Sequence, residues 1–136
     1  MKFKYKTDAD IFDHTITKND MNWIFNLTIE NIEYDIIIGK YVRIAVKTID
    51  NESIQNKFRK ITNSGNYVKL MHNVGYFISL YLTEIKNNVI YFRSVESKTK
   101  PGSGEIRGLM FKRAFEQNFD DVLVEKIDNE YKVTFN

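Results

Sequence analysis

Four side chains near the N-terminus are the residues of this sequence best suited to metal or acid–base chemistry. They lie in TDADIFDHT and comprise Asp8, Asp10, Asp13 and His14. Carboxylates and an imidazole close together can bind a hard cation or exchange protons with a substrate. The spacing departs from an EF-hand, because Phe12 occupies the third ligand position and no glycine follows. Short aspartates also form turns and caps, so a structural role competes with a small metal-dependent enzyme.

The stretch SVESKTKPGSGEIRG, residues 94–108, is the second candidate. It holds the only proline and three of the six glycines. A dinucleotide fingerprint is not matched, because Arg107 stands where its third glycine belongs, and no Gly-Lys-Ser/Thr completes a P-loop. The simpler interpretation is a flexible surface loop at 96–105. The functional alternative is an anion or nucleic-acid contact made by Lys98, Lys100, Arg107, Lys112 and Arg113.

Other catalytic chemistry has little support. The sequence has no cysteine, which excludes disulfides, thiolate metal sites and a cysteine nucleophile. Its two histidines, His14 and His72, are too far apart in sequence to define a triad, and no Gly-x-Ser-x-Gly occurs. No cofactor is expected, and nothing beyond the Asp8–His14 group favours an enzyme.

Length and composition indicate the kind of protein that must position these residues. A chain of 136 residues is the size of one ordinary domain, so residues 1–136 are predicted to form a single domain. Hydrophobic residues make up 43% of the chain, which is enough for a core. The N-terminus lacks the apolar run of a signal peptide and no segment is long and apolar enough for a membrane span. A cytoplasmic protein is therefore expected.

Alternation with a period of two residues is the main structural signal, and it predicts strands. Residues 22–49 are predicted to form a three-stranded antiparallel meander, with a tight turn near Asn31 and a second at Gly39-Lys40. Residues 1–21 are the least determined: 2–6 suggests an edge strand and 7–20 a loop or a turn of helix. Further strands are predicted at 66–73, 75–86 and 89–95, with a type I′ turn at Asn87-Asn88, and a hairpin turning at Asp128-Asn129 ends the chain.

Two segments show helical spacing instead. Residues 52–63 have apolar side chains at helical intervals, a capping residue before them and basic residues near their end. Residues 106–119 have a broad apolar face, although Gly108 near the start weakens a helix. The sum is an α+β fold, dominated by antiparallel sheet of about eight or nine strands in meanders and hairpins, with two packed α-helices.

Charge is divided unevenly near the C-terminus, and this bears on partners. Residues 98–117 carry five basic and two acidic side chains, whereas 118–136 carry two basic and five acidic ones. Neighbouring regions of opposite sign suit a protein partner better than a uniform polyanion. We therefore expect a small protein-binding module, such as an inhibitor, an immunity protein or a phage anti-defence protein, that occludes its partner. Nucleic-acid binding is the alternative, and either a monomer or an edge-paired homodimer is compatible with the sheet.

Overall fold

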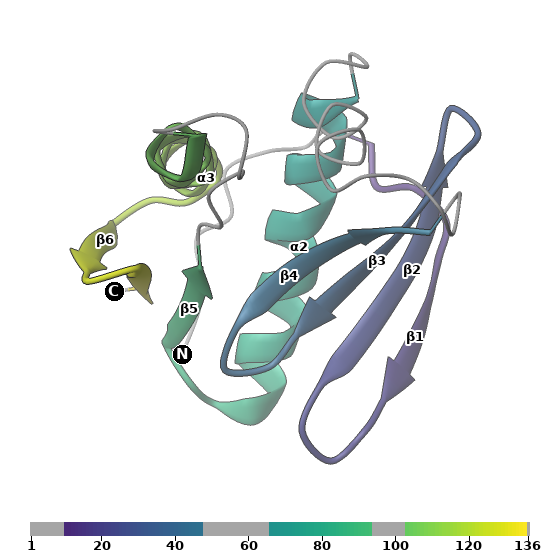
Figure 1. Cartoon of the computed structure of the whole chain (residues 1–136). Coiled ribbons are helices and arrows are strands. Elements are labelled where there is room, and N and C mark those ends of the chain that lie inside the picture. The colour runs from purple at the N-terminus through teal and green to yellow at the C-terminus, as the bar shows by residue number, and fades with distance from the viewer. Residues whose placement is uncertain (1–9, 48–65, 94–102, 136) are drawn as a thin grey trace.

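The computed structural model describes residues 10–47, 66–93 and 103–135 of the chain (Figure 1). These residues form seven antiparallel strands in two sheets and two helices, which confirms the α+β class. The expected total of eight or nine strands is wrong, mainly because an apolar segment assigned to two strands is one long helix. The helix predicted at 52–63 and the strand suggested at 2–6 lie outside the described residues.

The first sheet is an antiparallel meander in the order β1-β2-β3-β4. Its strands are β1 (His14–Lys18), β2 (Trp23–Ile29), β3 (Ile32–Ile38) and β4 (Val42–Val46). The last three confirm the predicted meander. Strand β1 was not predicted, since its HTITK sequence lacks a continuous apolar face; it is held by pairing along β2, from His14 opposite Leu27 to Lys18 opposite Trp23.

Two turns fix the register of this sheet. Glu30 and Asn31 have φ angles of 50° and 68°, the paired left-handed conformation of a two-residue hairpin turn, and this confirms the turn near Asn31. The turn after β3 approaches the β1–β2 connection so closely that a Cβ on Gly39 would lie 2.7 Å from the carbonyl oxygen of Met21. A glycine is therefore required there by space.

Helix α2 spans Tyr67–Ile85, where two strands were predicted at 66–73 and 75–86. The buried side chains recur at helical intervals: Leu70, Met71, Val74, Phe77, Ile78 and Leu82. Tyr76, Leu80 and Tyr81 on the flanks are partly buried, which made the segment look apolar on both faces of a strand. The second of the two predicted strands, 75–86, is longer than the roughly ten residues that strands rarely exceed, and this length favours a helix.

The second sheet combines strands from two parts of the chain. Strand β5 (Val89–Arg93) pairs with β7 (Glu130–Phe135), which also pairs with β6 (Val122–Ile127). The terminal hairpin is confirmed, with Asp128 at φ 54° in its turn, and it forms a small sheet of its own with β5. The hairpin turn predicted at Asn87-Asn88 is wrong: both residues follow the left-handed C-cap of α2 at Lys86.

Helix α3, Ser103–Asn118, confirms the helix predicted at 106–119 and covers the inner face of the small sheet. It begins before the end of the loop predicted at 96–105; residues 94–102 lie outside the described part of the chain. Gly108 lies against the ring of Tyr131, where a Cβ would overlap the phenol. This close contact explains a glycine within the helix.

Both sheets and both described helices contribute to one cluster of buried side chains. In Figure 1, α2 lies across one face of the first sheet, while β5, β6 and α3 are grouped to one side of it. Phe25 of β2 stacks on Phe77 of α2 with ring centroids 4.4 Å apart. On the other side of the core, Phe92 of β5 stacks on Tyr131 of β7 at 4.7 Å.

The sheets meet at the turn between β3 and β4. Tyr41 and Tyr91 form an isolated parallel bridge, in which the backbone N–H of Tyr91 donates to the carbonyl oxygen of Lys40 across 2.9 Å. The turn of one sheet is thereby docked on the first strand of the other.

Candidate functional site

The N-terminal group predicted for metal chemistry is anchored by its backbone. The buried Asn73 of α2 accepts a hydrogen bond from the Phe12 N–H at 2.9 Å and donates to the carbonyl oxygen of Asp10 at 3.4 Å. Side chains of Asp10 and Asp13 are exposed. In the described part of the chain no three His, Cys, Asp or Glu side chains gather closely enough to hold a metal; Asp8 lies outside that part.

His14 of this group belongs to the aromatic core. Its ring lies 4.7 Å from that of Phe77, and its Nδ1 lies 2.9 Å from the carbonyl oxygen of Phe12. His72 likewise bridges helices, since its Nδ1 lies 2.8 Å from Oδ1 of Asn118, a buried residue of α3. Both histidines thus make structural contacts.

The basic residues predicted to bind an anion do not all share one surface. Arg107 is only 7% exposed, whereas Arg113 is exposed and Lys112 is partly buried. Lys98 and Lys100 lie outside the described residues. The structure therefore places Arg107 apart from the solvent-facing cations of its helix. Anion or nucleic-acid binding by the other four basic residues stays a prediction.

A surface that combines apolar, aromatic and charged side chains was not predicted: it is the face of the small sheet that points away from α3. Alternation along the strands assigns to it the residues between the buried ones, with register partners side by side. We call this surface the open face; it comprises Val89, Tyr91, Arg93, Leu123, Glu125, Ile127, Glu130, Lys132 and Thr134. Leu123 and Ile127 are 51% and 50% exposed, although both are large and apolar.

Charges of both signs lie in register beside these apolar side chains. Lys132 stands between Tyr91 and Glu125, and Glu130 stands between Arg93 and Ile127. The Glu130 carboxylate accepts hydrogen bonds from the Tyr41 hydroxyl at 2.8 Å and from Arg93 Nε at 3.1 Å. The hydrogen bond from Tyr41 is the largest influence on the pKa of Glu130 and lowers it. Desolvation, the next in size, opposes this shift, whereas the hydrogen bond from Arg93 and the positive charges of Arg93 and Lys40 lower the pKa further. Glu130 therefore stays a carboxylate at neutral pH.

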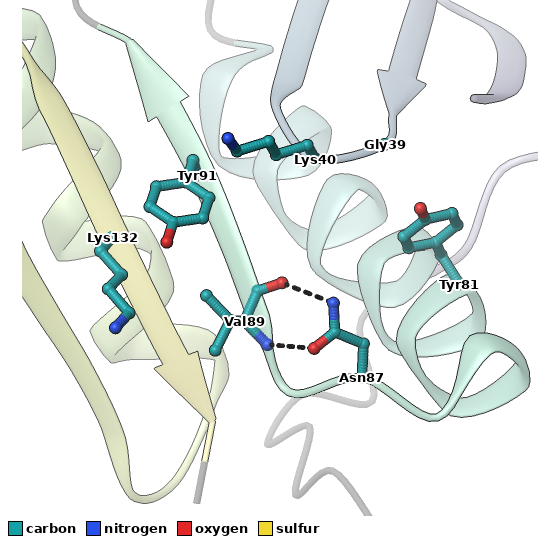
Figure 2. Close-up of a pocket in the computed structure, with 7 residues that line it drawn as sticks. All are labelled: Gly39, Lys40, Tyr81, Asn87, Val89, Tyr91 and Lys132. Carbon is teal, nitrogen blue, oxygen red and sulfur yellow. Dashed lines mark hydrogen bonds between the residues drawn. The ribbon is translucent and has the colours of Figure 1, made fainter. Parts of the chain in front are cut away.

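A pocket of about 430 Å³ opens at the edge of the open face, where the β3–β4 turn and the end of α2 approach β5 (Figure 2). It is lined by Gly39, Lys40, Tyr81, Asn87, Val89, Tyr91 and Lys132. The Lys40 Nζ lies 5.5 Å from the centroid of the Tyr91 ring, and burial raises the pKa of Tyr81. The pocket thus combines two ammonium groups, two phenols and an amide.

Sequence reasoning missed this site for an identifiable reason. The lining residues come from four separate segments, and the pocket exists only because a turn of one sheet docks on a strand of the other. The alternation at 89–93 and 130–135 did indicate which side chains share a face. It could not indicate that Lys40 would lie beside Tyr91.

Comparisons with known proteins found no relative, so the function has to be inferred from this geometry. The chain matches no protein-family model, and neither the curated proteins nor the solved structures include a detectable relative. Neither of the two described helices is long and apolar enough to cross a membrane.

Proposed function

We propose that this chain is a protein-binding module that docks the open face on another protein and acts by occluding the surface it covers. The observation that supports the proposal best is the half-exposure of Leu123 and Ile127 on one face of an edge strand. Two large aliphatic side chains left in water on the same face suit a surface that becomes buried on association, since burial of apolar area drives most protein–protein binding.

The composition of the open face agrees with an interface. Tyr91 lies in its central row and Arg93 in the neighbouring row, and tyrosine and arginine are among the side chains enriched where proteins bind each other. Arg93 is already oriented by Glu130 and lies 4.2 Å from the centroid of the Tyr41 ring. An arginine held in this way loses less conformational freedom when it binds.

The mixture of signs favours a protein over a nucleic acid. Arg93 and Lys132 on the open face are matched by Glu125 and Glu130, so the face offers a uniform polyanion as much repulsion as attraction. Nucleic-acid binding through Lys112, Arg113 and the basic residues before them is the second candidate. It would use a different surface and would show steep salt dependence.

Capture of a partner with matched surface variants tests the proposal. Immobilised wild-type protein should retain a protein from an extract of its source cells, and Leu123→Asp with Ile127→Asp should reduce that retention at least tenfold. Met21→Asp is the matched control, because Met21 is 82% exposed on the β1–β2 connection, outside the open face. Thermal unfolding of each variant confirms that it is folded.

Two results would overturn the proposal. Equal retention by the Asp pair and by Met21→Asp would remove the open face from the interaction. Salt-sensitive binding of DNA or RNA that is lost in a folded variant with Lys98, Lys100, Lys112 and Arg113 changed to Ala would favour the nucleic-acid alternative instead.

A further inference from the structure

The geometry of the pocket at the sheet junction points to a small-molecule site: we propose that it binds a nucleoside monophosphate-like ligand, an organic phosphate joined to a flat ring. This activity goes beyond docking on a protein, although the pocket shares Val89, Tyr91 and Lys132 with the open face. A volume of about 430 Å³ is within the usual range for ligand pockets, ~300–1,000 Å³.

The charge of the lining selects an anion. Lys40 and Lys132 contribute two ammonium groups, and no carboxylate is among the lining residues. Neither lysine forms a salt bridge within the described part of the chain. Two carboxylates lie outside the lining: Glu125 stands beside Lys132 in register, and Glu130, which attracts Lys40, accepts hydrogen bonds from Tyr41 and Arg93. A phosphate bound by one of these ammonium groups would supply the negative charge that the lining itself lacks.

The aromatic rings of Tyr81 and Tyr91 favour a ligand whose uncharged part is a flat ring. Tyr81 and Tyr91 line the pocket from α2 and from β5, and aromatic faces bind flat rings by stacking. Figure 2 shows Lys40 extending over Tyr91, with Tyr81 on the opposite side of the pocket. A ligand that joins a charged group to a flat ring can use both features at once, whereas inorganic phosphate uses one.

The lower wall of the pocket is held by local hydrogen bonds. The Asn87 amide donates to the carbonyl oxygen of Val89 at 3.3 Å, and its Oδ1 accepts from the backbone N–H of Val89 at 3.3 Å (Figure 2). The same Oδ1 also accepts from the backbone N–H of Asn88 at 2.8 Å. The opposite wall is fixed by the Tyr91 N–H bond to Lys40. Walls that are formed in advance reduce the entropic cost of binding.

Titration calorimetry at low salt with adenosine monophosphate, adenosine and inorganic phosphate as probes tests this site. The monophosphate should bind, and adenosine and phosphate should each bind at least tenfold more weakly. Lys40→Gln and Lys132→Gln should each weaken the monophosphate by about tenfold, the usual value of one charge-assisted hydrogen bond. Tyr91→Leu should weaken it by a similar factor.

Lys126→Gln is the matched control, because Lys126 is exposed on the same sheet but does not line the pocket. Amide NMR spectra add a local readout, in which Asn88 and Tyr91 N–H signals should shift on binding. Absence of any heat and any shift at millimolar monophosphate would overturn the proposal. So would binding that Lys126→Gln weakens as much as Lys40→Gln does. Neither result depends on whether the open face binds a protein.

Discussion

The backbone N–H of Tyr91 lies 2.9 Å from the carbonyl oxygen of Lys40, and this hydrogen bond joins two sheets that are otherwise built from separate parts of the chain. Around it lie the rings of Tyr41 and Tyr91, 5.9 Å apart, and the ion pair of Arg93 with Glu130. The pocket and the charged part of the open face both border this joint. Its integrity therefore governs both proposed binding functions.

Removal of the Tyr41 hydroxyl should weaken the joint in a pH-dependent way. The Glu130 pKa is lowered in the folded protein, chiefly by the hydrogen bond from Tyr41. The stability that this carboxylate contributes is thus present above its ordinary pKa of 4.5 and is lost as the pH falls through the lower, folded value. Tyr41→Phe should be less stable than wild type at pH 7, and the difference should shrink below pH 4.5.

Urea unfolding of both proteins between pH 3 and pH 7 measures this difference, and carbon NMR of the Glu130 carboxyl follows its titration directly. In Tyr41→Phe the pKa of Glu130 should move up toward its ordinary value. If the stability difference between wild type and Tyr41→Phe stays constant over the pH range, the Tyr41 hydroxyl stabilises the fold independently of the ionisation of Glu130.

Alkaline pH should destabilise the fold through Tyr67. Its hydroxyl donates to the carbonyl oxygen of Met110 at 3.0 Å, and burial raises its pKa from 10.0 to about 12. Between these values the unfolded chain has lost the proton and the folded chain keeps it, so the free energy of unfolding falls as the pH rises. In denaturant titrations above pH 10, the free energy of unfolding of Tyr67→Phe should fall less steeply with pH than that of wild type. An unchanged slope would show that groups other than Tyr67 cause the loss of stability.

Removal of the stacked contact between Phe25 and Phe77 should cause a large loss in the free energy of unfolding. Both rings are fully buried and their planes differ by 9°. Phe77→Ala should lower the free energy of unfolding by about 3–5 kcal/mol, the typical cost of a large core cavity. Val68→Ala on the same helix is the control: Val68 is 64% exposed, so its loss should cost no more than about 0.5 kcal/mol. Similar losses in the two variants would contradict the assigned packing of α2.

The turn at Gly39 should not accept a side chain. Because its Cβ would meet the backbone oxygen of Met21, relief requires the β3–β4 turn to shift. Gly39→Ala should destabilise the protein by about 1–3 kcal/mol, as overpacking usually does, and the same shift should move Lys40 relative to Tyr91. Denaturant unfolding measures the first effect and the Tyr91 N–H chemical shift the second. A stable variant with an unshifted Tyr91 signal would refute the close approach.

The parts of the fold that were predictable are those whose signal is local. The alternation in 22–47 and 122–135 determines which faces are buried, and left-handed residues at Asn31 and Asp128 mark the β2–β3 and β6–β7 reversals. Helix α3 has apolar side chains at helical intervals, of which Phe111, Ala114 and Phe115 pack on the core, whereas Ile106 and Leu109 are exposed. In each case neighbours in sequence carry the pattern that predicts the element, so no knowledge of the tertiary structure was needed to predict it.

The failures arose where tertiary contacts outweigh local preference. Helix α2 is rich in β-branched and aromatic residues, which favour strands, yet its side chains lie between the first sheet and α3 and must be apolar over a wide arc. Strand β1 has little apolar pattern and exists through pairing with β2. The candidate site depends on contacts such as that of Lys40 with Tyr91, which are 51 positions apart in the sequence, so no local pattern can predict them.

The contact between Gly108 and Tyr131 has a consequence for any redesign of this protein. The phenol ring occupies the space that a side chain on α3 would need, so positions 108 and 131 cannot be chosen independently. Replacing the glycine by a better helix former is admissible only together with a smaller residue in β7. The two positions behave as a single unit of sequence, although one belongs to a helix and the other to a strand.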